Sequence, residues 1–210
     1  MNLFRLDASI LPSASASAEI ADLAGAEWAG AHPEGAVTRR NLGTSPLPAE
    51  AWGLATTAGF TPEGERSREH RDAVELAGAL ADELHGADAL ILAVPLYNYG
   101  VSQHFKTWVD LVIAGAGTGT PVLKEKPTAL VTTLGGGYGP GTPKEGWDHS
   151  TGYLTRVLGD LWQADLTVIK RELTLAATTP AMAGLRETAA ELHAAAREAA
   201  AAAGKSLAGR

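Results

Sequence analysis

Short apolar runs of strand length alternate along this chain with longer stretches whose apolar residues recur at helical spacing. A strand in a parallel sheet needs a crossover long enough to hold a helix before the next strand begins, so this alternation is typical of a parallel sheet with helices on both faces. Five such units fit in 210 residues, and we predict an α/β fold with a doubly wound, five-stranded parallel sheet. The predicted strands are 2–6, 36–41, 87–94, 128–134 and 166–171, and the predicted helices are 15–29, 66–84, 101–113, 150–161 and 182–203.

The order of the strands decides where such a sheet binds ligands. Five units favour the order 2-1-3-4-5, the flavodoxin-like arrangement, in which ligands bind at the carboxyl ends of strands 1, 3 and 4. Residues 42–65 contain three prolines and are predicted to form a loop with one short helix near 49–55. The chain after Gly204 is predicted to be frayed. No repeat or linker marks a second domain, so we predict one domain over residues 1–210.

Charge and cysteine content exclude several classes of function. The formal net charge is −7 and no basic block occurs, which disfavours binding to nucleic acid or to anionic membranes. The longest apolar runs are too short to span a bilayer, and no secretory signal precedes them, so we expect a cytoplasmic protein. The chain has no cysteine, so any redox chemistry must be carried by a bound cofactor. The six histidines show no metal-ligand spacing.

A loop rich in serine follows the first predicted strand. Ser9, Ser15 and Ser17 alternate with small residues, Ala16 among them, just before a helical pattern begins. The unpaired N–H groups and partial positive charge of a helix N-terminus attract phosphate, and serine hydroxyls add neutral donors. This pattern indicates a monophosphate site, as a cofactor such as FMN would need. Ordinary helix capping in a solvated loop is the alternative that these residues leave open.

The loop after the third predicted strand combines an aromatic surface with hydrogen-bonding groups. Pro95 and Leu96 end the strand, and Tyr97, Asn98 and Tyr99 follow. A flavin ring needs an apolar or aromatic wall and a few polar partners at its pyrimidine edge, and this loop contains both. An aromatic turn that only packs over a helix end is the alternative.

Glycines dominate the loop after the fourth predicted strand. Thr133 and Leu134 lead into Gly135 and Gly136, and Tyr138 follows shortly after. Glycine lets the backbone approach a planar ligand closely, and the Tyr138 hydroxyl is a candidate partner for the ring edge. A flexible surface loop is the alternative.

These motifs occur in the order found in a known family. The serine loop, Pro95–Tyr99, the helix Ser102–Asp110 and Thr133–Gly136 resemble the FMN-dependent NAD(P)H azoreductase and quinone reductase family of flavodoxin-like proteins, and the resemblance spans most of the chain. It implies that the serine loop binds the FMN phosphate, that the other two loops hold the isoalloxazine, and that homodimers carry active sites at the subunit interface. The implied cofactor-binding residues are Ser9, Ser15, Ala16, Ser17, Pro95, Leu96, Tyr97, Asn98, Tyr99, Thr133, Leu134, Gly135, Gly136 and Tyr138.

The chain departs from the family pattern in two places. Where the family has Ser-Arg before the glycine pair and a histidine two residues after it, this chain has Thr133, Leu134 and Tyr138. A basic partner for the flavin is therefore missing unless Lys144 or His149 supplies it. Residues 114–126 are also shorter and richer in glycine than the family leads us to expect. These departures bear on the substrate and on the choice of nicotinamide more than on FMN.

The implied activity is hydride transfer from NADH or NADPH to FMN, followed by reduction of a quinone, an azo compound or a related small-molecule acceptor in a ping-pong sequence. Tyr138 is the candidate catalytic residue, stabilising negative charge on the reduced flavin, unless its ring only packs as part of a lid. Two alternatives stay open: a dedicated biosynthetic flavin reductase and a flavodoxin-like electron carrier without turnover. The aromatic residues Phe105 and Trp108 indicate either a subunit interface or a core face.

Overall fold

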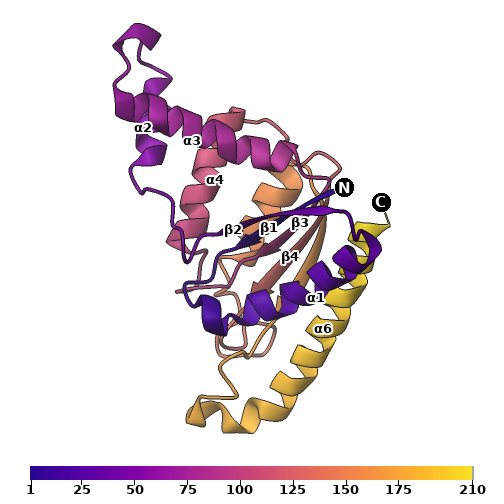
Figure 1. Cartoon of the computed structure of the whole chain (residues 1–210). Helices are drawn as coiled ribbons and strands as arrows, with labels where there is room; N and C mark the ends of the chain where they lie inside the picture. Colours follow the sequence, from indigo (N-terminus) through magenta and orange to yellow (C-terminus); the bar gives the residue numbers. More distant parts are fainter. Residues whose placement is uncertain (210) are drawn as a thin grey trace.

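The computed structural model describes residues 1–209, apart from the side chain of Pro12. Five strands form one sheet in the order β2-β1-β3-β4-β5, and every neighbouring pair is parallel, which confirms the predicted topology (Figure 1). The predicted strand bounds differ from the observed ones by at most two residues. The strands are β1 (Asn2–Asp7), β2 (Ala36–Asn41), β3 (Ala89–Ala93), β4 (Pro127–Thr133) and β5 (Asp165–Arg171).

Helices cover both faces of the sheet. One face carries α1 (Ala16–Ala31) and α6 (Arg186–Ala208), which lie side by side in Figure 1. The other carries α3 (Arg68–His85) and α4 (Gln103–Ala116), together with α5 (Thr151–Thr155) and the π-helical turn η3 (Arg156–Leu161). Side chains of a strand alternate between faces, so Leu3 packs under α1 and α6 while Phe4 packs against the opposite layer.

The aromatic residues of α4 belong to the core. Phe105 and Trp108 are both fully buried, and the Trp108 ring lies 6.3 Å from Phe4 and 5.6 Å from Trp162 between ring centroids. Of the two readings of this pattern, the core face is therefore correct, and these two residues provide no subunit interface.

The prediction of a frayed C-terminus is wrong. Helix α6 continues to Ala208, and Gly204 and Leu207 are buried against α1. A Cβ atom on Gly204 would lie 2.4 Å from the carbonyl oxygen of Ala24, so the two helices approach at a distance that only glycine permits.

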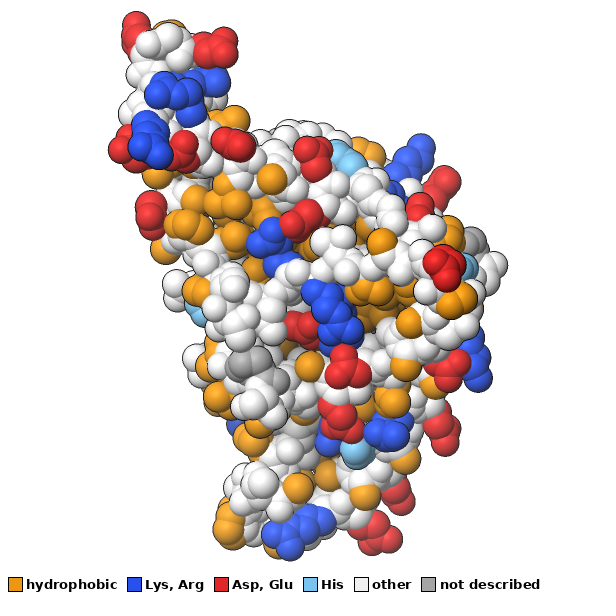
Figure 2. All heavy atoms as spheres, in the orientation of Figure 1, with side chains coloured by type: hydrophobic (Ala, Val, Ile, Leu, Met, Phe, Trp, Pro, Cys, Tyr) orange, Lys and Arg blue, Asp and Glu red, His pale blue; other side chains and the backbone are white. Residues whose placement is uncertain are grey.

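Residues 42–67 form an arm whose helix α2 (Ala51–Ala58) packs against α3 and α4 and whose short turn η2 (Glu63–Glu65) projects at the upper left of Figure 1. The short helix predicted near 49–55 is confirmed. Trp52 and Phe60 are exposed on this arm, and Figure 2 shows charged side chains of both signs around its tip. Among residues 1–209, no helix is both long enough and apolar enough to cross a lipid bilayer.

Candidate functional site

A cavity of about 210 Å³ opens at the carboxyl edge of the sheet. It lies where the strand order reverses, which is the ligand site of doubly wound sheets. The loops that follow β1, β3, β4 and β5 all contribute to it. The lining residues are Ser9, Leu11, Ala14, Ser15, Ala16, Ser17, Pro95, Leu96, Tyr97, Thr133, Gly135, Thr174 and Leu175.

The start of α1 forms the polar end of the cavity. Ser15 is the N-cap, and its hydroxyl accepts a hydrogen bond from the Ala18 N–H at 3.1 Å. The Ser17 hydroxyl is buried and lies 3.1 Å from that of Ser15. Two of the predicted serine residues, Ser15 and Ser17, therefore meet at the N-terminus of α1 and line the cavity there.

Tyr97 joins the loop after β3 to the loop after β1. Its hydroxyl lies 3.1 Å from the Ser9 hydroxyl and accepts a hydrogen bond from the Ile10 N–H at 3.2 Å. The Ser9 hydroxyl also accepts from the Leu11 N–H at 3.2 Å. The sequence suggested only an aromatic face for Tyr97, whereas the structure shows a cross-link that holds the two loops together.

Asn98 and Tyr99 form a tight turn at the rim. The backbones of Tyr97 and Gly100 exchange hydrogen bonds of 3.0 and 2.9 Å, and both residues between them have positive φ, 48° for Asn98 and 69° for Tyr99. This backbone region costs an L-residue about 1–2 kcal/mol. Neither residue is among the described residues that line the cavity, although the Tyr99 ring contacts Tyr138, another predicted site residue.

The glycine loop after β4 contributes its first glycine directly. A Cβ on Gly135 would lie 2.7 Å from Leu175 Cδ1, so the Leu175 side chain packs directly on the backbone of this glycine at the cavity wall. Leu134 and Tyr138 are buried and pack with Leu96 behind that wall. The Gly136 carbonyl accepts a hydrogen bond from the Leu173 N–H at 3.1 Å, which ties this loop to the one after β5.

Thr174 and Leu175 are lining residues that the sequence reasoning missed. They follow β5, whose carboxyl end lies at the same edge as those of β1, β3 and β4. Parallel topology alone places this loop beside the site, and that was the available signal.

An aromatic group with one cation lies at the rim. Tyr99 contacts Trp147 and Tyr138 edge to face, with ring centroids 5.4 and 6.4 Å apart. Lys144 Nζ lies 5.3 Å from the Tyr99 ring centroid and 5.7 Å from that of Tyr138, within cation–π range. Of the two candidates for a basic partner, Lys144 holds this position, while the His149 backbone N–H donates to the Tyr99 carbonyl at 3.0 Å.

Ion pairs anchor this rim segment to β5. Lys170 Nζ lies 3.1 Å from Asp148 Oδ2 and 3.0 Å from Glu172 Oε1. Burial lowers the pKa of Lys170, but the two carboxylates outweigh this effect and raise the pKa above its ordinary value. The Glu172 carboxylate also accepts from the Tyr138 N–H at 2.8 Å, so Tyr138 is held at its backbone.

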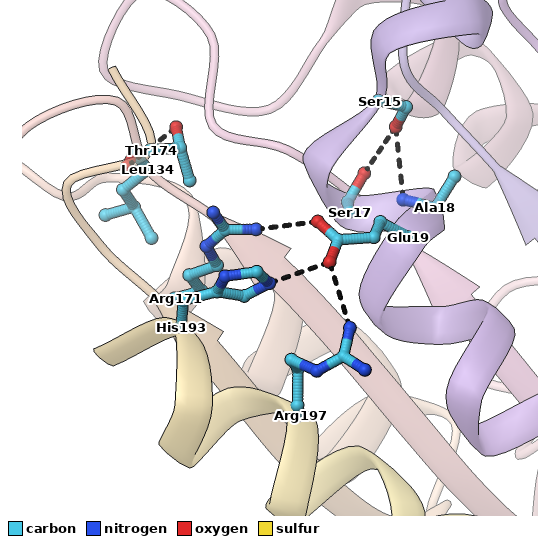
Figure 3. A network of polar contacts seen from close by, with 9 residues as sticks. All are labelled: Ser15, Ser17, Ala18, Glu19, Leu134, Arg171, Thr174, His193 and Arg197. Carbon is cyan, nitrogen blue, oxygen red and sulfur yellow. Dashed lines mark hydrogen bonds and ion pairs between the residues drawn. The ribbon is translucent and has the colours of Figure 1, made fainter. Parts of the chain in front are cut away.

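A second group of charges surrounds Glu19, in the first turn of α1 (Figure 3). Its carboxylate lies 3.0 Å from Arg171 Nη1, 2.7 Å from His193 Nε2 and 3.3 Å from Arg197 Nη1. Burial raises the pKa of Glu19, but His193 and Arg171 outweigh this effect and hold the pKa below its ordinary value. Within residues 1–209, no three histidine or acidic side chains are placed to hold a metal ion.

A family model described as a flavodoxin-like fold matches residues 1–202. A protein of Frankia casuarinae named FMN-dependent NADH:quinone oxidoreductase is 39% identical over 187 residues, covering 87% of this chain and 88% of that protein. One of the same name from Streptomyces avermitilis is 36% identical and covers 99% of this chain and 97% of its own length.

Solved structures show the same fold at lower identity. An azoreductase from Bacillus anthracis superimposes with a TM-score of 0.76 at 20% identity, covering 98% of this chain and 99% of that one. An FMN-dependent NADH-azoreductase from Bacillus anthracis, solved in complex with FMN, superimposes with a TM-score of 0.68 at 15% identity, covering 95% of this chain and 99% of that one.

Proposed function

This chain belongs to the flavodoxin-like family, together with relatives named FMN-dependent NADH:quinone oxidoreductase, and we propose that it is an FMN-dependent oxidoreductase. NADH or NADPH is the proposed hydride donor, and a quinone, an azo compound or a related electrophile is the proposed acceptor. The observation that carries the proposal is the cavity lined by the capped start of α1 and by the Tyr97 loop, which Ser9 ties to the loop after β1.

The residues of this cavity fit FMN. Hydroxyls of Ser9, Ser15 and Ser17 and the N–H groups of the first turn of α1 suit a phosphate, because they donate hydrogen bonds without adding negative charge. Apolar walls from Pro95, Leu96 and the loop residues around them suit the isoalloxazine ring. When bound, FMN supplies the two-electron chemistry that this chain, which has no cysteine, does not supply from its own side chains.

The close approach at Gly135 supports the same assignment. Since glycine has no side chain, it leaves the cavity wall open at the point where the Leu175 side chain approaches its backbone. We assign Thr133, Gly135 and Gly136 to the backbone side of the flavin site, and Asn98 and Tyr99 to its rim.

Tyr138 packs behind the cavity wall and is not among the residues within 1–209 that line the cavity, so its proposed catalytic role, stabilising negative charge on the reduced cofactor, requires its hydroxyl to reach the bound cofactor from there. Lys144 beside its ring adds a positive charge at the same rim. The exposed rings of Tyr99 and Trp147 offer an aromatic surface for a planar acceptor. Because donor and acceptor would use the same cavity in turn, we propose ping-pong kinetics.

We also propose a homodimer with active sites at the subunit interface. Ile10, Leu11, Trp147 and Leu175 are exposed apolar side chains in the loops at this edge of the sheet, and apolar surface near a site is typical of an interface. One domain over residues 1–210 and a cytoplasmic location stay part of the proposal. Gel filtration with light scattering tests the dimer.

The visible spectrum of the purified protein, with FMN added and then NADH or NADPH under anaerobic conditions, tests the function. We expect bound FMN to bleach when the nicotinamide is added and to reoxidise with a quinone. Flavin that binds but does not bleach would point to an electron carrier. A protein that binds no flavin would overturn the proposal.

A further inference from the structure

Glu19 places a negative charge where a bound phosphate would oppose it. It lies one turn beyond the N-cap of α1, and its backbone N–H donates to the Ser15 carbonyl at 3.1 Å. Ser15 and Ser17, which line the polar end of the cavity, therefore share a helix turn with a carboxylate. A carboxylate in a first turn suits an isolated helix, but it repels an anion that binds to the same helix terminus.

Three basic side chains from other elements converge on this carboxylate, as Figure 3 shows. Arg171 comes from the end of β5, and His193 and Arg197 come from α6. With Glu19 at −1 and the two arginines at +1 each, the group carries a net charge of +1 even with His193 neutral. The cluster therefore reverses the sign of the charge that Glu19 alone would place beside the serine hydroxyls.

Of these three side chains, Arg171 is the most buried. Its side chain is only 14% exposed, and its Nε is buried without a hydrogen-bond partner in the described part of the chain. It lines a second cavity, of about 390 Å³, with Arg186, His193 and Thr174. Thr174 also lines the first cavity, so the second cavity, which Arg171 lines, adjoins the first. Because Arg171 is mostly buried, its charge is screened less than that of an exposed side chain.

We propose that Arg171 is a specificity-determining residue: by neutralising Glu19 and leaving a net positive charge beside α1, it makes the cavity select the phosphorylated flavin FMN over riboflavin. This inference rests on the proposed function, since it concerns the phosphate of the proposed cofactor. Arg171 acts through Glu19 and through its own charge, and it need not touch the isoalloxazine.

The test is the dissociation constant of FMN and of riboflavin, measured by flavin fluorescence quenching for the wild type, Arg171→Gln and Arg171→Gln/Glu19→Gln. For Arg171→Gln we expect FMN to bind about tenfold more weakly, as for loss of a charge-assisted contact, with riboflavin unchanged within about twofold. The double variant removes the opposing carboxylate and should regain most of the lost FMN affinity. A merely structural salt bridge would change the dissociation constants of FMN and riboflavin to the same extent, in the single and in the double variant.

Arg68→Gln is the matched control. It makes the same charge change on α3, at a side chain that is 84% exposed and pairs only with Asp72 among the ion pairs of the described residues, so FMN affinity should not move. Thermal melts by circular dichroism check folding. If Arg171→Gln does not fold, Arg197→Gln takes its place, with an expected loss of about threefold because its contact is longer and more exposed.

Three results would overturn this inference and leave the proposed flavin function standing. They are equal weakening of FMN and riboflavin binding in Arg171→Gln, an unchanged FMN dissociation constant in Arg171→Gln, and no recovery of FMN affinity in the double variant. A wild type that binds FMN and riboflavin equally would do the same while the flavin function stands. A wild type that binds neither would overturn the proposed function and this inference together.

Discussion

The contact between α1 and α6 makes a sharp prediction for Gly204→Ala. The new Cβ would lie 2.4 Å from the Ala24 carbonyl oxygen, 2.8 Å from Ala24 Cα and 2.8 Å from Glu27 Cβ. Two of these three atoms belong to the backbone of α1, so no change of rotamer relieves the clash. The helices must separate, and α6 must give up part of its buried face.

The size of the effect follows from two opposing terms. Overpacking of a close contact costs about 1–3 kcal/mol, and the backbone partners place Gly204 near the upper end. Replacing glycine by alanine inside a helix stabilises the helix by roughly 1 kcal/mol. We therefore expect the free energy of unfolding to fall by about 2 kcal/mol, which lowers the melting temperature by roughly 4–8 °C in a chain of this size.

Gly25→Ala is the matched control, on α1 beside the clash partner. Its Cβ would lie 4.0 Å from Ile91 Cδ1, an ordinary contact, so the helix-propensity gain is kept and stability should rise by about 0.5–1 kcal/mol. Urea unfolding followed by circular dichroism measures both variants, with unchanged slopes expected. If Gly204→Ala unfolds at the same urea concentration as the wild type or at a higher one, the reasoning from close approach is refuted.

The remaining predictions concern the site and its ionisable groups. Tyr97→Phe removes the hydroxyl that joins the two loops, so stability should fall by about 1 kcal/mol in urea unfolding, and a flavin titration should show weaker FMN binding. Tyr138→Phe should slow reduction of bound FMN in stopped-flow absorbance with little change in FMN affinity, and an unchanged rate would remove its proposed role. The pKa of Glu19 in the folded protein lies below its ordinary 4.5. Its contribution to stability is therefore present above about pH 4.5 and is lost as the pH falls through the folded-state pKa. The stability of Glu19→Gln should depend less steeply on pH in the acid range. Burial, reinforced by the charge of Asp110, raises the pKa of Tyr153 to about 12. The neutral form of Tyr153 therefore stabilises the fold below about pH 10, and that contribution is lost towards pH 12. An absorbance titration should show one tyrosine that ionises late, and Tyr153→Phe should abolish that step.

The sheet was predictable because its signal is local. Runs such as Ala89–Ala93 are wholly buried, and the segments between strands are long enough for parallel crossovers. The end of α6 was not predictable, since alanine-rich sequence carries no sign that Gly204 and Leu207 meet α1. Likewise, spacing alone does not tell whether Trp108 faces the core or a second subunit.

The candidate site also contains one part that could be predicted from the sequence and one part that could not. Ser9, Ser15, Ser17 and Tyr97 were predicted to meet because topology brings the ends of their strands together, and the structure places all four at one cavity. The ion pair between Glu19 and Arg171 joins residues 152 positions apart, and nothing in either local sequence points to the other. Such charge pairs depend on how α6 and β5 pack against α1, which becomes known only with the full fold.

The cross-link between Ser9 and Tyr97 also sets the order of events during synthesis. The two residues are 88 positions apart, and β1 pairs with β3 in the middle of the sheet. At about 5–20 residues per second, roughly 4–18 s separate their emergence from the ribosome. During that interval the loop after β1 lacks both β3 and Tyr97, so the part of the chain made first takes its working form only after the Tyr97 loop has been made.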